Sequence, residues 1–162
     1  MRQSFEPQKQ LGEVDISAIR FNERSRDDIP RLLRGLQYIH ITPELQKAVF
    51  QILEQAIEEN VNRSNGRPGM NLWRVLVLGT LRLCINCDYE HLLELANQRG
   101  TLRQMLGHGP LDEHVYRLQT VCDNVSLLTP EILDQVNQVV VNAGHQLVKK
   151  KRRFKAVVTP SS

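Results

Sequence analysis

The chain has 162 residues, of which 41% are apolar and 24% are charged. This length predicts one domain, or one domain with tails, and the apolar content is sufficient for a packed core. The formal net charge of +3 is small, which excludes a uniformly basic nucleic-acid-binding protein. Any attraction to nucleic acid has to come from local patches of positive charge.

The cysteine count and the N-terminal sequence indicate an intracellular compartment. Three cysteines, an odd number, do not suggest a disulfide framework. The first ten residues are polar and lack the apolar run of a secretory signal peptide. We therefore expect a cytoplasmic protein, associated with the nucleoid if it binds DNA.

The first part of the chain predicts a polar arm followed by two helices. Residues 1–25 are polar with scattered apolar side chains, and we expect a flexible arm. A helix is predicted to begin at Asp27–Pro30, because acidic residues and proline favour a first helical turn, and Gly35 interrupts its apolar stripe. A second helix begins at Thr42-Pro43-Glu44, which are residue types of an N-cap and first turn, and ends at Asn65-Gly66.

The stretch Leu72–Ile85 predicts a central helix. Its only charged residues are Arg74 and Arg82. A helix that is apolar on nearly every side has to be surrounded by protein, and about 14 residues is too short for a bilayer, which needs ~20. The other helices are therefore expected to pack round this one.

The second half of the chain predicts further helices. Asp88 caps one, Gly100 allows a sharp turn, and Thr101–Leu106 forms a short piece. Asp112–Asn124 is predicted as a helix with Val115 and Leu118 turned inward. Thr129-Pro130-Glu131 starts the last helix, which can continue into a basic run. The prediction is an all-α single domain of about six or seven helices over residues 26–148, with a basic tail over 149–162.

Several motifs share an order and spacing with one known family. They are Gly66-Arg67-Pro68, the Leu72–Ile85 run, Tyr89–Ala96, Met105-Leu106-Gly107, Val115–Thr120, Leu128–Glu131 and Asn142–His145. Together they resemble the N-terminal domain of DDE-type insertion-sequence transposases of the ISNCY-like group, over roughly residues 36–151. The resemblance implies a helix-turn-helix module that grips the terminal inverted repeats of the element. It implies DNA as the partner, together with a second copy or an intact transposase, and neither a membrane nor a small-molecule substrate.

The turn between Ala96 and Gly100 is compatible with a helix-turn-helix. Arg99 stands where an apolar residue is usual, and a plain helical hairpin is the alternative. Two predicted helices are candidates for reading bases: Thr101–Leu106, with Arg103 and Gln104, and Asp112–Asn124, with His114, Arg117, Gln119 and Asn124. Arginine suits guanine edges and glutamine or asparagine suits adenine edges. The alternative for each side chain is simple solvation.

Two basic features are candidates for contacts with the DNA backbone. Arg67 lies in Gly66-Arg67-Pro68, which resembles the core of an AT-hook, whose arginine enters the minor groove; a simple interhelical turn is the alternative. The basic cluster consists of Lys149, Lys150, Lys151, Arg152, Arg153 and Lys155. It could neutralise several phosphates, or be a solvated linker. The stretch Leu111–Val148 is acidic and should avoid DNA, which supports the alternative of a helical protein-interaction module.

Neither a catalytic site nor a metal site is predicted. Cys84-x-x-Cys87 with His91 would need a distant fourth ligand from Cys122 or His108 to hold zinc. Cys84 lies in the apolar helix, where a free cysteine acts as a small apolar residue. No nucleophile–base pair is suggested by spacing, the histidines are interpreted as cap or core groups, and no cofactor is expected.

The resemblance also bears on the C-terminal end. In the resembled family a nuclease-like domain follows, whose acidic residues hold divalent metal ions, and its first acid lies in a strand similar to Arg-Cys-Asp-Ser-Phe-Val-Val-Glu. This chain ends Val157-Val158-Thr159-Pro160-Ser161-Ser162. Loss of one base from a fitting set of codons converts the first ending into the second. The hypothesis is a frameshift just before Val157 that leaves a non-enzymatic fragment, either an inhibitor of transposition or a relic.

Overall fold

The all-α prediction is confirmed. The structure is a computed structural model that describes residues 14–22, 24, 26–64 and 70–155; over 58–64 and 143–155 it describes the helical backbone alone. These residues form a short 3-10 turn and seven α-helices, with no strand among them. In chain order the elements are η1 Ile16–Ala18, α1 Asp28–Ile41, α2 Pro43–Ser64, α3 Leu72–Ile85, α4 Tyr89–Gln98, α5 Gly100–Met105, α6 Leu118–Val125 and α7 Pro130–Lys155.

Side-chain caps explain why several helices begin where the sequence predicts. The carboxylate of Asp27 accepts a hydrogen bond from the Ile29 amide at 3.0 Å, and that of Asp88 accepts one from the His91 amide at 2.8 Å. Asn71 caps α3 in the same way, through the Arg74 amide at 2.8 Å. Each cap satisfies a backbone donor that has no partner inside the helix. Gly35 does not interrupt α1, which continues to Ile41.

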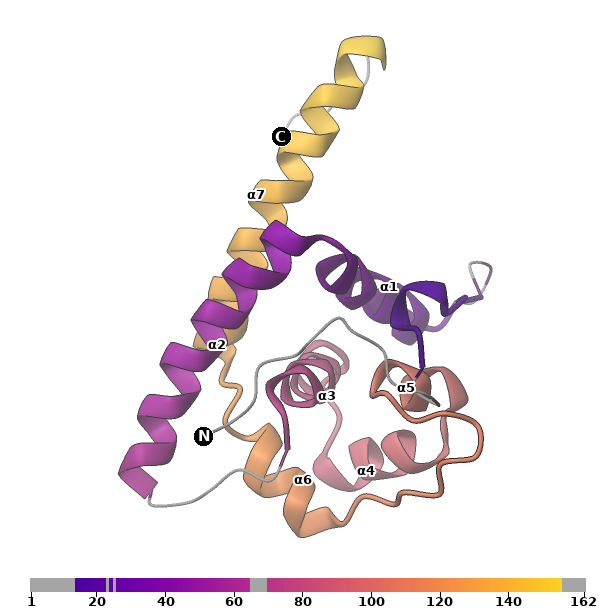
Figure 1. Cartoon of the computed structure of the whole chain (residues 1–162), viewed down its shortest axis with the longest axis vertical. Coiled ribbons are helices and arrows are strands. Elements are labelled where there is room, and N and C mark those ends of the chain that lie inside the picture. The colour runs from indigo at the N-terminus through magenta and orange to yellow at the C-terminus, as the bar shows by residue number, and fades with distance from the viewer. Residues whose placement is uncertain (1–13, 23, 25, 65–69, 156–162) are drawn as a thin grey trace.

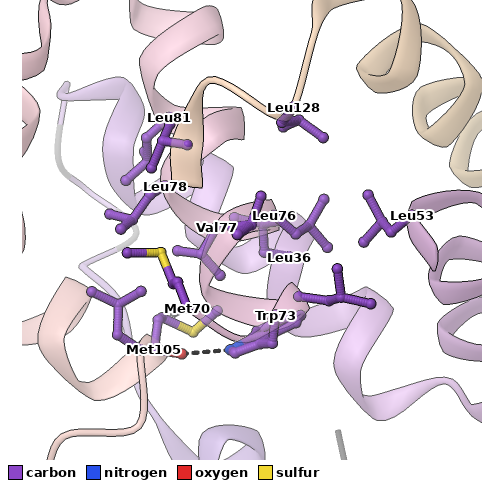
Figure 2. Packing of buried hydrophobic residues seen from close by; sticks show 14 of the residues in the cluster. Leu36, Leu53, Met70, Trp73, Leu76, Val77, Leu78, Leu81, Met105 and Leu128 are labelled. Carbon is purple, nitrogen blue, oxygen red and sulfur yellow. Dashed lines mark hydrogen bonds between the residues drawn. The ribbon is translucent and has the colours of Figure 1, made fainter. Parts of the chain in front are cut away.

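Helix α3 is the central helix that its composition predicts. Its residues Leu72, Trp73 and Val75–Leu81 are buried, and it lies against α1, α2, α4 and α6. Figure 2 shows its side chains meeting Leu36 of α1, Leu53 of α2 and Leu128, which precedes α7. The indole nitrogen of Trp73 donates a hydrogen bond to the carbonyl of Met105 at 2.7 Å, which ties α3 to the end of α5. No helix in the described parts of the chain is long and apolar enough to span a membrane.

Close packing at α3 requires a glycine. A Cβ built on Gly79 would lie 2.8 Å from the Cβ of Leu128, which is too close for carbon atoms that are not bonded. The absence of a side chain therefore lets the segment between α6 and α7 cross directly over α3.

Helices α2 and α7 form a long pair beside this core. They run antiparallel along one side of the molecule, and α7 extends past the start of α2 (Figure 1). The inward face of α7 is apolar, with Ile132, Leu133 and Val136 buried. The pair thus completes the core on one face and leaves the opposite face of α7 to solvent.

The structure also corrects the expected N-terminal arm and one expected helix. Residues 14–22, expected to belong to a flexible arm, are held against α1: Ile16 and Ile19 are buried, and the side-chain amide of Gln37 donates to both of their carbonyls at 2.9 Å. The predicted helix Asp112–Asn124 is wrong in its first half, because residues 112–117 are not helical and α6 begins only at Leu118. Val115 and Leu118, expected to face inward, are 66% and 40% exposed.

Candidate nucleic-acid interface

The connection between α4 and α5 is very short. A single residue, Arg99, separates the two helices in an extended conformation. Gly100 is the first residue of α5, and a Cβ at this position would have open space around it. Contrary to the expectation, the bend therefore does not require a glycine here. Leu92 and Ala96 of α4 and Leu102 and Met105 of α5 are buried. The two helices therefore share one apolar seam, and Gln104 is the only exposed polar side chain of α5.

Two of the candidate DNA-contacting arginines make contacts within the protein. The guanidinium of Arg99 lies 2.9 Å from the carboxylate of Asp27, and this interaction, after the hydrogen bond from the Ile29 amide, helps to hold the pKa of Asp27 below its usual value. Arg103 donates to the carbonyls of Ala96 at 3.3 Å and Asp112 at 3.0 Å. Both arginines thus hold the α4–α5 region to its neighbours.

A buried histidine organises the segment between α5 and α6. His108 is 3% exposed. Its Nδ1 lies 2.7 Å from a carboxylate oxygen of Asp112, and its Nε2 lies 2.6 Å from the hydroxyl of Tyr116. The ring of His114 stacks on His108 at a centroid distance of 5.1 Å. We call His108, Asp112, His114 and Tyr116 the His108 cluster.

Contacts with the helices anchor the His108 cluster at both ends. Asn97 of α4 pairs with the backbone of Tyr116: its side-chain oxygen accepts from the Tyr116 amide at 2.7 Å, and its nitrogen donates to the Tyr116 carbonyl at 3.1 Å. Arg74 of α3 donates to the carbonyl of Leu106 at 2.9 Å. These bonds satisfy backbone groups that a helix would otherwise pair, and they hold Tyr116 against α4 although residues 112–117 are not helical.

Protonation states within the His108 cluster follow from its burial. Burial lowers the pKa of His108, and the positive charges of Arg74 and Arg103 act in the same direction. Burial also raises the pKa of the Tyr116 phenol to about 12. A neutral His108 donates from Nδ1 to Asp112 and accepts from the Tyr116 hydroxyl at Nε2. The hydrogen bond from His108 in turn lowers the pKa of Asp112.

The order carboxylate–imidazole–hydroxyl matches the connectivity of a nucleophilic triad, but its environment favours a structural role. A nucleophile has to reach substrate and lose its proton readily, whereas Tyr116 is 4% exposed and its pKa is raised to about 12. The cluster therefore acts as a clasp that fixes the loop. The sequence analysis did not predict this cluster. The regular spacing of His108, Asp112 and Tyr116, four residues apart, is the sequence feature that could have indicated it.

The clasped loop leaves apolar side chains at the surface. Leu111 is 92% exposed, Val115 of the same loop is also exposed, and Leu118 at the start of α6 is exposed as well. Arg117, a candidate DNA contact, is exposed at the N-cap position of α6 and makes no side-chain cap. Asn124, another candidate base reader, is buried and accepts a hydrogen bond from the Met70 amide at 3.3 Å. Asn124 therefore belongs to the core and cannot reach a base edge.

The remaining basic candidates lie at the ends of the described regions. Arg67 is outside the described residues. Lys149, Lys150, Lys151, Arg152, Arg153 and Lys155 lie within the backbone span of α7. In Figure 1 this end of α7 projects beyond all the other helices. The basic cluster is thus part of a continuous helix that starts in the core.

The cysteines form no evident metal site. Cys84 is exposed rather than buried as expected, and Cys87 and Cys122 are partly exposed. Desolvation raises the pKa of Cys84 and of Cys87, which disfavours the thiolate that binds zinc. Among the residues that the structure describes, no group of three or more His, Cys, Asp or Glu side chains could hold a metal ion.

Comparison with known proteins gives no assignment. No protein-family model, no curated protein and no solved structure matches this chain.

Proposed function

We propose that the chain is a DNA-binding domain of an insertion-sequence transposase, whose partner is the terminal inverted repeat of the element. The observation that carries the proposal is the placement of the basic cluster on the projecting end of α7 (Figure 1). Seven helical residues span about 10 Å, and B-DNA carries one negative charge per about 1.7 Å. Six cations in that length match the charge density of a duplex.

Base reading in this proposal falls to the α4–α5 turn. Arg99 and Arg103 are engaged with Asp27 and with backbone carbonyls. The exposed amides of Gln98 and Gln104 are available beside them, and an amide side chain can form a bidentate pair with adenine. Helix α5 lies across the body from the projecting end of α7 (Figure 1). Phosphate binding and base reading are therefore separate elements and are tested separately.

Phosphate binding is tested by fluorescence anisotropy with a labelled duplex over a range of salt concentrations. The test variant changes Lys149, Lys150, Lys151, Arg152 and Arg153 to Gln. The matched control removes five exposed cations elsewhere: Arg20, Arg24, Arg26, Arg31 and Lys47. We expect the test variant to lose most of its affinity and to flatten the dependence of log K on log salt. Equal loss in both variants would reject a specific role for α7.

Sequence recognition is tested with a duplex of the element's terminal inverted repeat and a scrambled duplex of the same composition. We expect tighter binding to the repeat, because each lost base contact costs about 1–3 kcal/mol. Gln104→Ala should reduce this preference and leave binding to the scrambled duplex unchanged. Equal affinity of the parent chain for both duplexes would reject recognition of element ends.

A second candidate function is a helical protein-interaction module. It is favoured by Leu111 and Val115, which the clasped loop holds at the surface, and by the exposed Leu118 at the start of α6. Exposed apolar surface, where it is contiguous, is typical of a protein contact. In this case the double variant Leu111→Ser/Val115→Ser loses binding to the partner protein, whereas DNA affinity is unchanged.

A further inference from the structure

The solvent face of α7 carries a regular stripe of side chains. Within the described side chains, the stripe consists of the exposed residues Glu131, Asp134, Gln138 and Val141. Their spacing is three, four and three residues, which keeps them on one side of a helix. The buried residues Ile132, Leu133 and Val136 lie on the opposite side. The stripe is therefore the face that α7 turns away from the body of the molecule.

The same spacing continues in the sequence to the end of α7. The positions that extend the alternation of four and three residues are His145, Val148, Arg152 and Lys155. The stripe begins with two acids and ends with two cations. Its middle is uncharged apart from His145 and includes both of its valines. We call these eight positions the α7 stripe.

The α7 stripe is complementary to itself when one copy is reversed. In an antiparallel pair of helices, residue numbers rise along one helix and fall along the other. The numbers of two facing positions therefore always have the same sum. One register pairs Glu131 with Lys155 and Asp134 with Arg152. The same register pairs Gln138 with Val148 and Val141 with His145. All eight positions thus find a partner within the stripe of the other copy.

We propose that two copies of this chain associate through their α7 helices, antiparallel, in this register. Each end of the pair then holds two acid–cation contacts, and the centre holds the exposed Val141, which is 59% exposed in the single chain. A parallel pair would instead set Glu131 and Asp134 against their own copies, which is unfavourable. Exposed ion pairs contribute little and are screened by salt. The association is therefore weak, concentration-dependent and sensitive to salt.

The pair would place two basic clusters at its opposite ends. In this register Arg152 of one copy lies beside Asp134 of the other, and 18 residues of helix separate these positions in one chain, or about 27 Å. This is somewhat less than one turn of B-DNA, ~34 Å. The self-association itself rests on the α7 stripe and is independent of the proposed DNA binding, so it is measured without DNA.

The experiment uses two charge-reversed forms of the full chain. Form A carries Glu131→Lys and Asp134→Lys, and form B carries Arg152→Glu and Lys155→Glu. Analytical ultracentrifugation at low salt and hundreds of micromolar protein should give the parent chain an average mass above 18.6 kDa. Forms A and B should each be monomeric, and an equal mixture should recover the parent's association, because every reversed charge then faces an opposite one. Circular dichroism of each form confirms that it is folded.

The orientation is tested by disulfide cross-linking in a background with the three native cysteines changed to serine. Val141→Cys and His145→Cys should each fail to cross-link with themselves and should form a disulfide dimer when mixed. A parent chain that stays monomeric, or charge-reversed forms that associate as the parent does, would overturn the proposal. Self-cross-linking of either single variant would overturn the antiparallel register. The variant Leu111→Ser/Val115→Ser is the control and should keep the parent's mass, since it leaves the α7 stripe intact.

Discussion

Helices α3 and α7 show how differently two regular helices can be used in one small protein. In α3, every residue from Leu72 to Leu81 except Arg74 is buried, and four other helices lie against this helix. Helix α7 buries one face, turns a polar stripe to solvent and projects beyond the body (Figure 1). Substitutions in α3 should therefore act on folding, whereas substitutions on the outer face of α7 should act on binding. The predictions below test this contrast.

The largest effect is expected from truncating a core leucine of α3. Leu76 is fully buried, and Leu76→Ala should lower the free energy of unfolding by about 2–5 kcal/mol through lost burial and a cavity. Val141→Ala on the outer face of α7 should change it by less than about 0.5 kcal/mol. Urea denaturation measures both variants. Similar losses would contradict the contrast between the two helices.

A smaller effect should follow from adding a methyl group where α3 has no space. Gly79→Ala brings a Cβ within 2.8 Å of the Cβ of Leu128, and it should destabilise by about 1–3 kcal/mol because the segment over α3 has to shift. Gly35 in α1 has nothing within 4 Å. Gly35→Ala should therefore stabilise by about 0.5–1 kcal/mol through helix propensity. Thermal unfolding distinguishes the opposite signs.

The His108 cluster should respond to loss of a single hydroxyl. Tyr116→Phe removes the donor to Nε2 of His108, 2.6 Å away, and leaves a buried acceptor without its partner. We expect a loss of about 1–2 kcal/mol in unfolding free energy. His91→Ala on the exposed face of α4 is the control and should be nearly neutral. Unchanged stability of Tyr116→Phe would mean that Tyr116 does not clasp the loop.

The smallest expected effect is a dependence of stability on pH. Burial lowers the pKa of His108 below its usual 6.5, and it lowers that of His40 in the same direction. The unfolded chain therefore binds more protons, so stability is fully present above about pH 6.5 and falls as the pH drops below it. The lowered pKa of Asp112 adds a loss only near and below its usual 3.8.

Urea midpoints at two pH values on either side of the histidine range measure this effect. His108→Gln should reduce the difference between the two midpoints, with His40 supplying the rest. An unchanged difference in the variant would assign the pH dependence to other groups.

Local chemistry in the sequence was sufficient to predict most of the helices. The caps at Asp27 and Asp88, and the nearly continuous apolar run of α3, act on residues that lie close to them in the sequence. The apolar run alone gives the bounds of α3, Leu72–Ile85. The start of α7 at Pro130 follows from Thr129, whose hydroxyl accepts a hydrogen bond from the Ile132 amide at 3.3 Å.

Only the tertiary structure decided which polar side chains are available for binding. Arg99 is drawn to Asp27, which is 72 residues away in sequence, and Asn124 is buried against Met70, 54 residues away. Residues 112–117 had a helical pattern in the sequence, but the pairing of Tyr116 with Asn97 and the burial of His108 keep them out of a helix. Helix starts are set by neighbours along the chain, and those are written in the sequence. The partners of a long polar side chain come from whichever helices the packed core brings beside it.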